Sequence, residues 1–207
     1  MASSGTRGRQ EPSPDTALHA DAERPSRRDE ILRAAAQLLA ERGSRAVGVD
    51  DVGAAVGVTG PAIYRHFASK DAMLAEMLLR ISETLLAGGS DRVAEAGEDP
   101  AAQLRALIAF HVEFALDNPA LITVQDRDLG SLPDADAAQV RRLQRRYVEV
   151  WVDVLSRLLR DGDPASCRAR AHAVFGLINS TPHSAGRLGR PALATLLAEM
   201  AWSAATA

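Results

Sequence analysis

The chain has 207 residues, of which 46% are hydrophobic and 25% are charged, and its formal net charge is −3. It is long enough to bury a hydrophobic core, and no excess of basic residues marks it as a nucleic-acid binder. A single cysteine, Cys167, excludes a disulfide framework and a paired-cysteine metal site. No apolar run approaches the roughly 18 residues of a membrane span, so we expect a soluble cytoplasmic protein without membrane association.

Residues 1–25 are rich in proline, serine, alanine and mixed charges and show no hydrophobic period. Such a composition predicts a disordered N-terminal arm. Arginines in the arm could contact a DNA minor groove, as the arms of some DNA-binding domains do. Acidic residues dilute that charge, however, so a solvated tail that makes no contact explains the same composition. The sequence leaves both interpretations open.

The first helix is predicted to begin at Ser26, because "SRRD" has the form of a serine cap followed by an acidic residue at the third helical position. Apolar residues recur at helical spacing through Leu39, and Gly43 suits the position that closes a helix. A second helix is predicted over 50–56, and Gly57 suits a tight turn after it.

A third, short helix is predicted over 59–67, where Thr59 can cap the start and Pro61 occupies the first turn at little cost. A helix, a glycine turn and a further short helix form a helix-turn-helix. Ile63 and Phe67 lie four residues apart and should pack inward. The small residues that open the helix would let its N-terminus approach base edges in a major groove, and the polar residues after them would reach bases or phosphates.

A fourth helix follows, which Ser69 can cap, and the charge of Lys70 at its start suits a phosphate. Surface exposure without function is the alternative explanation for Tyr64 and His66, since most exposed polar residues are only solvated. The predicted DNA-binding residues are Thr59, Gly60, Pro61, Ala62, Tyr64, Arg65, His66 and Lys70.

The fourth helix is predicted to weaken at Gly88 and Gly89 and to end at "GEDP", residues 97–100. Prolines punctuate the remaining chain, and no strand-like alternation or internal repeat appears. The predicted fold class is therefore all-α, with a helix-turn-helix domain over 26–70 and a larger helical domain over 71–207. The further helices are predicted over 101–117, 119–127, 135–160, 165–181 and 191–205.

The segment "AERGSRAVGVDDVGAAVGVTGPAIYRHFASKDAML", residues 40–74, resembles the TetR family of bacterial transcriptional regulators in the order and spacing of its motif residues. The resemblance implies a homodimer that binds double-stranded DNA at a palindromic operator and responds to a small-molecule effector. Gly48 departs from the pattern, because a threonine that contacts phosphate is common there, so we assign it no DNA contact. Asp50 and Asp51 suit a helix N-terminus but repel DNA, and we assign neither to the interface.

The same resemblance places the effector between helices of the larger domain, where apolar residues and few charges favour a hydrophobic ligand. His111 could equally be a buried, hydrogen-bonded core residue, and core packing also explains Tyr147 and Trp151. Residues 125–128 could lie near the pocket or cap a short helix. The predicted ligand-binding residues are Phe110, His111, Phe114, Gln125, Tyr147 and Trp151.

The last two helices are implied by the resemblance to form a four-helix dimer bundle, and an apolar stripe there has no evident partner within one subunit. No catalytic constellation, metal-ligand spacing or glycine-rich phosphate loop is identifiable, so we expect no enzyme activity and no cofactor. We therefore predict a ligand-responsive repressor. The alternative is a helical ligand-binding or enzymatic protein whose head no longer binds DNA. The predicted dimer interface consists of Phe175, Leu193, Leu196, Leu197 and Met200.

Overall fold

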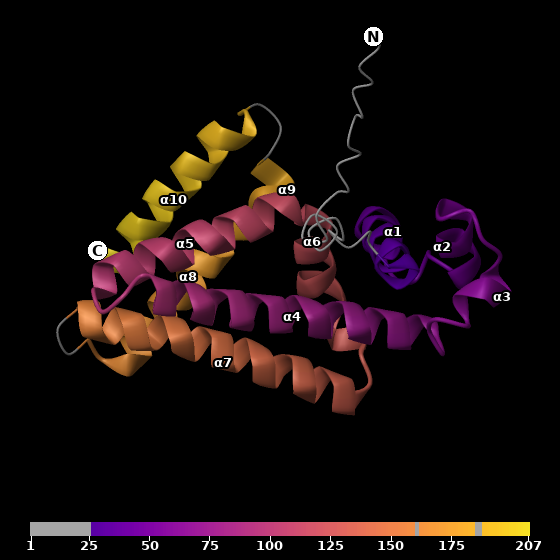
Figure 1. The fold of residues 1–207 in the computed structure, drawn as a ribbon, viewed down its shortest axis with the longest axis horizontal. Helices are drawn as coiled ribbons and strands as arrows, with labels where there is room; N and C mark the ends of the chain where they lie inside the picture. The colour runs from indigo at the N-terminus through magenta and orange to yellow at the C-terminus, as the bar shows by residue number, and fades with distance from the viewer. Residues whose placement is uncertain (1–25, 160–161, 185–187) are drawn as a thin grey trace, which may run out of the picture.

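The computed structural model describes residues 26–159, 162–184 and 188–207. Within these ranges the regular structure is helical and no strand occurs, which confirms the predicted all-α class (Figure 1). The predicted disordered arm, residues 1–25, lies outside the described ranges. Helices α1 to α3 form a head at one end of the molecule, and the long helix α4 runs from the head into a helical body (Figure 1).

Local hydrogen bonds set both ends of α1 (Arg27–Arg42). The hydroxyl of Ser26 accepts from the backbone N–H of Asp29 at 3.2 Å, and the carboxylate of Asp29 accepts from the backbone N–H of Ser26 at 3.2 Å. Gly43 closes the helix with a φ of 85°, a region that favours glycine. The predicted start and stop of this helix are confirmed.

The helix-turn-helix consists of α2 (Val49–Ala55) and α3 (Gly60–Ile63). Thr59 precedes α3, but its side chain makes no capping hydrogen bond. The backbone tightens near Ile63: the N–H of Arg65 donates to the carbonyl of Ala62 at 3.3 Å and that of His66 to the carbonyl of Ile63 at 2.8 Å, each three residues back, and the N–H of Phe67 also donates to the carbonyl of Ile63 at 3.0 Å. The prediction of a longer third helix is therefore wrong at its C-terminal end.

Helix α4 (Lys70–Glu95) continues through Gly88 and Gly89, where the sequence predicted a weak point. Two aromatic rings from neighbouring helices pack directly on these glycines. An added Cβ at Gly88 would lie 2.3 Å from Cζ of Phe110, and one at Gly89 would lie 2.5 Å from Cε2 of Tyr147. The glycines therefore serve close packing, and that packing offsets their poor helix propensity.

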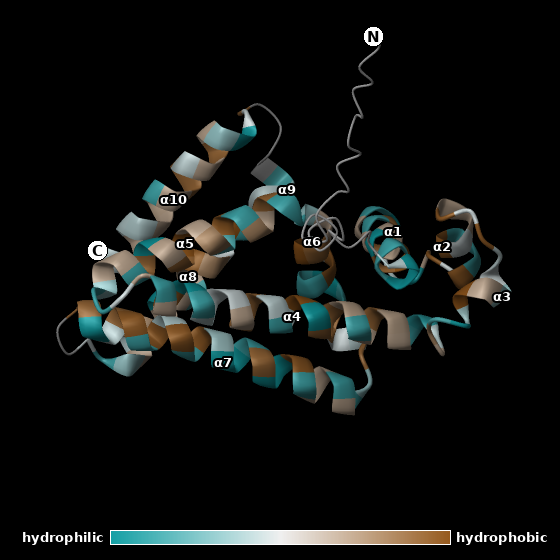
Figure 2. Cartoon of the chain, in the orientation of Figure 1, coloured by the Kyte–Doolittle hydropathy of each residue, from teal (hydrophilic) through white to brown (hydrophobic). Residues whose placement is uncertain are grey.

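The rest of the body packs around α4. Helix α4 lies along α7 and α5, α10 packs on α5 and α8, and α6 packs against α1 of the head. Bands of hydrophobic residues alternate with polar residues along α4, α5 and α7 (Figure 2). The predicted helix over 165–181 ends at Ile178, and a separate short helix follows. The elements are α5 (Pro100–Asp117), α6 (Pro119–Asp128), the 3-10 turn η2 (Leu129–Ser131), α7 (Asp134–Leu158), α8 (Pro164–Ile178), α9 (Thr181–Ser184) and α10 (Arg190–Thr206).

Within the described part of the chain, no single helix has the length and apolarity needed to cross a bilayer. One bent pair, α5 with the α6–η2 segment, meets those two criteria only when its helices are taken together.

Candidate DNA-binding surface and ligand cavity

Helix α3 and the turn after it direct apolar side chains inward and polar side chains outward. Ile63 and Phe67 are buried, whereas Tyr64 is 55% exposed. Pro61 and Arg65 are also exposed. The predicted division of the two faces is confirmed. This surface lies at the end of the head that points away from the body (Figure 1).

Close backbone approaches hold α3 against α2. An added Cβ at Gly60 would lie 1.9 Å from Oδ1 of Asp50, and one at Gly53 would lie 2.8 Å from the carbonyl oxygen of Val58. Gly57, in the turn, has a φ of 71°. Glycine at positions 53 and 60 lets the two helices meet without a steric clash, and glycine at position 57 suits the positive φ of the turn. Among the other predicted contact residues, Thr59 is exposed, Ala62 and His66 are half-buried, and Gly60 is buried.

The ammonium group of Lys70 holds the loop between α1 and α2. Its Nζ donates to the backbone carbonyl of Ser44 at 2.6 Å and to that of Val47 at 3.2 Å. An ammonium group has three protons, so one proton remains for an acceptor such as a phosphate. The sequence predicted the phosphate contact alone. It did not predict the loop contacts, because those acceptors are backbone carbonyls more than 20 residues away.

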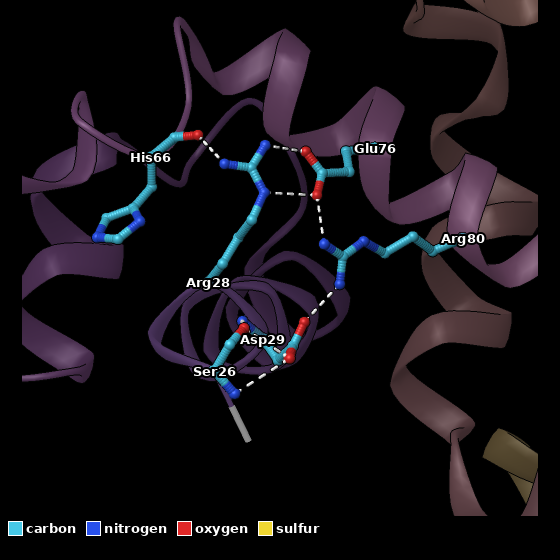
Figure 3. A network of polar contacts seen from close by, with 6 residues as sticks. All are labelled: Ser26, Arg28, Asp29, His66, Glu76 and Arg80. Carbon is cyan, nitrogen blue, oxygen red and sulfur yellow. Dashed lines mark hydrogen bonds and ion pairs between the residues drawn. The ribbon is translucent and has the colours of Figure 1, made fainter. Parts of the chain in front are cut away.

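A network of ion pairs joins α1 to α4 beside the helix-turn-helix (Figure 3). Glu76 accepts from Nε of Arg28 at 2.7 Å and pairs with Arg80 at 2.7 Å. Arg28 also donates to the backbone carbonyl of His66. Arg80 also pairs with Asp29. The hydrogen bond from Arg28 holds the pKa of Glu76 below its ordinary value, against the opposing effect of burial. The network ties α4 both to α1 and to the turn after α3.

Helix α6 contacts the head through its last two residues. The guanidinium of Arg127 donates to the backbone carbonyls of Leu39 and Ala40 near the end of α1, the second at 3.3 Å. Asp128 is 4% exposed, and its carboxylate accepts from the hydroxyl of Ser44 at 2.7 Å. The carbonyls at a helix C-terminus carry partial negative charge, which favours a cation there. Arg127 and Asp128 therefore attach α6 to the head.

A cavity of about 320 Å³ lies in the body, with walls from α4, α5, α6, α7 and α8. Its volume is within the range of small-molecule sites. Three of the six predicted ligand-binding residues line it, namely His111, Gln125 and Tyr147. No group of three or more metal-ligating side chains occurs among the described residues.

The other three predicted ligand-binding residues face different surroundings. Phe110 packs on α4 at Gly88. Trp151 has no exposed surface and does not line the cavity, although its ring contacts those of His111, Tyr147 and Phe175. Phe114 lines another hollow, of about 630 Å³, between α1, α4, α5 and α6. The structure does not bring these three residues into the cavity, and the predicted assignment is corrected for them.

A chain of buried hydrogen bonds crosses the cavity wall through His111. Its Nδ1 lies 3.1 Å from the hydroxyl of Tyr147, and its Nε2 lies 3.2 Å from Oδ1 of Asn179. Burial lowers the pKa of His111 to about 4, so the ring is neutral at neutral pH. A neutral ring that donates from Nε2 to Asn179 accepts at Nδ1 from Tyr147. Burial also raises the pKa of the Tyr147 hydroxyl, which keeps it a donor.

Phe175 packs inside the subunit and forms part of the cavity wall. Its ring stacks on His111 with centroids 4.9 Å apart and on Tyr147 at 5.6 Å. The ring of Trp151 meets it in a T-shaped arrangement, with centroids 5.0 Å apart. Phe175 thus packs against these rings within the subunit but is only half-buried, so its place in a dimer interface stays a prediction.

The apolar stripe of α10 divides between the core and the surface. Leu193 and Leu197 are 4% and 5% exposed and pack within the subunit. Leu196 and Met200 are 41% and 47% exposed. The prediction that the whole stripe lacks a partner inside one subunit is therefore wrong for Leu193 and Leu197. It holds for the other two.

The fold and the head define a helix-turn-helix protein with a helical regulatory body. Residues 31–77 match the family described as "Bacterial regulatory proteins, tetR family", and residues 97–204 match "Tetracyclin repressor-like, C-terminal domain". The chain belongs to the TetR family of transcriptional regulators. It is thus a DNA-binding regulator and not an enzyme, which confirms the predicted family and excludes the enzymatic alternative.

Individual relatives agree with this membership. The HTH-type transcriptional repressor KstR2 of Mycolicibacterium smegmatis is 31% identical over 140 residues, which make up 66% of this chain and 67% of the relative. The structure of the ketosteroid transcriptional regulator KstR2 of Mycobacterium tuberculosis matches with a TM-score of 0.76 and 22% identity, over 89% of this chain and 97% of that one. AibR, solved in complex with isovaleryl coenzyme A and operator DNA, matches with a TM-score of 0.70 and 20% identity, over 84% of this chain and 96% of that one.

Proposed function

We propose that this protein is a homodimeric repressor that binds a palindromic operator and releases it when a small, mainly apolar molecule occupies the body cavity. One observation carries the proposal: α6 contacts both the cavity and the head. Gln125 and Asp126 line the cavity, and the next two residues, Arg127 and Asp128, contact the head. A ligand that displaces α6 would therefore displace α1 as well.

The DNA-binding part of the proposal rests on the exposed surface around α3. Tyr64 and Arg65 can reach bases or phosphates, and the small residues Gly60, Pro61 and Ala62 let the backbone approach the groove. The free proton of Lys70 is available to a phosphate. In a dimer, each α3 would occupy one major groove, with the half-sites about 34–36 Å apart.

The dimer part rests on the exposed apolar residues of α10. Leu196 and Met200 are large hydrophobic side chains with nearly half their surface in contact with solvent. A two-fold symmetric contact between the α10 helices of two subunits would bury both residues in each subunit. The cytoplasm is the proposed location, because the operator DNA is there.

Release follows from thermodynamic linkage. If the ligand binds more tightly to a state whose heads are wrongly spaced, ligand and operator weaken each other's binding by the same factor. The relative named as a transcriptional repressor supports repression as the direction of control. The AibR complex, which contains isovaleryl coenzyme A and operator DNA, supports the binding of both a small molecule and an operator by a similar fold.

The test is a binding titration with DNA from upstream of the protein's own gene, followed by a footprint. We expect nanomolar-range binding, roughly 10³-fold tighter than on a shuffled sequence of the same length. The footprint should show two symmetric half-sites, and a reporter gene placed downstream should lose expression when the protein is present. Equal affinity for the shuffled fragment would contradict the proposal.

A further inference from the structure

The wall of the body cavity contains an acidic residue but no arginine or lysine among the described residues. The ionisable groups there are Asp126 and His172 at the wall, together with the buried pair His111 and Tyr147. The buried His111 and Tyr147 are neutral, and no arginine or lysine faces the interior from the described residues.

One polar atom of the wall lacks a partner. Oε1 of Gln125 is buried and accepts no hydrogen bond within the described part of the chain. A buried acceptor without a donor carries a desolvation cost that a ligand donor can remove. The neighbouring amide of Asn179 differs, because its Oδ1 already accepts from His111. A ligand that donates a hydrogen bond to Oε1 of Gln125 would therefore satisfy this buried acceptor.

The carboxylate of Asp126 adds a second acceptor beside Gln125. Burial raises the pKa of Asp126, while the nearby His183 opposes that shift. Asp126 is exposed overall but lines the cavity, and a carboxylate at that position gains from a hydrogen-bond donor or a cation and is destabilised by a second anion. Gln125 and Asp126 therefore both favour a ligand group that donates a hydrogen bond and carries no negative charge.

We infer that the cavity takes an apolar molecule whose polar end is a hydrogen-bond donor without negative charge, such as a hydroxyl or an amino group, and that it rejects carboxylates. This inference rests on the proposed function of the cavity as the effector site, and it deepens that proposal by naming the ligand's chemical class. The apolar part of the ligand would lie against Leu85, Val148 and Phe175. The polar end would meet Gln125 and Asp126.

The test uses three probes with one carbon skeleton: 4-phenylbutan-1-ol, 4-phenylbutylamine and 4-phenylbutanoate. Each is titrated into the full-length Trp202→Phe protein, in which Trp151 is the remaining tryptophan. The edge-on contact between Trp151 and Phe175 makes its fluorescence a reporter of the cavity wall. We expect the alcohol and the amine to bind about tenfold more tightly than the carboxylate, or better, a difference of about 1.4 kcal/mol or more.

Two variants separate the contributions. Asp126→Asn should weaken the amine and strengthen the carboxylate by roughly fivefold each, with little change for the alcohol. Gln125→Leu should weaken the alcohol by a similar factor. Glu113→Gln removes the same charge from an exposed α5 position outside the cavity wall and should leave the order of the three probes unchanged.

The order of affinities decides the inference, and release of the operator decides the proposed function. A carboxylate that bound as tightly as the alcohol would overturn the inference while leaving the cavity as a ligand site. No fluorescence change with any of the three probes would also overturn it. Probe binding in the expected order without any weakening of operator binding would support the ligand class and contradict ligand-controlled release.

Discussion

Gln125 and Arg127 lie two residues apart on α6 and contact different domains. The amide of Gln125 lies in the wall of the body cavity, and the guanidinium of Arg127 donates to the carbonyl of Leu39 on α1. Residues two apart in an α-helix point in directions that differ by about 200° around its axis, so α6 can face the cavity with one side and the head with the other. The proposed coupling between ligand and DNA depends on this arrangement.

Arg127→Ala should loosen the end of α1 and the loop that follows it. The change removes two charge-assisted hydrogen bonds to helix-terminal carbonyls, so backbone amides in residues 40–47 should exchange with solvent roughly tenfold faster. Hydrogen exchange read by mass spectrometry measures this directly. Arg141→Ala, at an exposed position of α7, removes the same charge and should leave exchange in 40–47 unchanged. Unaltered exchange in the Arg127 variant would contradict the assigned attachment of α6 to the head.

Arg65→Ala should weaken operator binding by about 1–3 kcal/mol if the guanidinium pairs with a guanine. The side chain is exposed next to the predicted groove-facing residues. Titrations on operator and shuffled DNA give the specificity ratio, which should fall along with the affinity. Equal losses on the two DNAs would reduce Arg65 to a phosphate contact.

Lys70→Ala should reduce both folding stability and DNA binding. Loss of the bonds from Nζ to the carbonyls of Ser44 and Val47 leaves those acceptors without their cation, at a cost of about 1–3 kcal/mol. Urea unfolding measures this cost. DNA binding should weaken alike on every sequence, with a shallower dependence on salt. A full-length Lys70→Ala protein with an unchanged unfolding midpoint would show that the loop contacts contribute nothing.

Glu76→Gln should destabilise the protein near neutral pH and matter less in acid. The pKa of Glu76 is depressed in the folded state, so its ionisation stabilises the fold above the ordinary glutamate pKa. That stabilisation is lost as the pH falls through the depressed folded-state pKa. We expect a loss of about 1 kcal/mol at pH 7 that shrinks steadily below pH 5.

Denaturant titrations of wild type and variant between pH 7 and pH 3 measure this dependence. Glu149→Gln is a matched control, because Arg168 also holds the pKa of Glu149 below its ordinary value but this pair is largely exposed. The control should lose less stability at every pH. If the difference in free energy of unfolding between wild type and Glu76→Gln stayed constant down to pH 3, the charge of Glu76 would make no contribution to stability.

Leu196→Glu combined with Met200→Glu should produce a monomer. Both side chains are exposed on α10, so the subunit itself should still fold, while the two carboxylates of each subunit would repel those of its partner across a symmetric contact. Analytical ultracentrifugation measures the mass, and affinity for the full operator should fall roughly 100-fold or more as the second head is lost. Ala109→Glu, on the exposed face of α5, should remain dimeric. A dimeric double variant would place the interface elsewhere.

The sequence by itself determined the helix boundaries of α1, the helix-turn-helix and the inward and outward faces of α3. These features depend on local physics: a serine cap answered by Asp29, a glycine where φ is positive at Gly43 and Gly57, and side chains four residues apart. The motif that carries the TetR resemblance is equally local, and it predicted the family, whereas the lack of strand-like alternation predicted the all-α class.

Only the tertiary structure decided which neighbour each apolar or charged side chain meets. Helical spacing indicates that Leu193, Phe114 and Trp151 lie on apolar faces, but not whether core, cavity or another subunit covers those faces. Gly88 and Gly89 looked like a weak point because the rings that pack on them come from other helices. The partners in the Arg28–Glu76 pair are 48 residues apart, so no spacing rule connects them. Long-range contacts depend on how helices pack together, and a one-dimensional pattern does not contain that information.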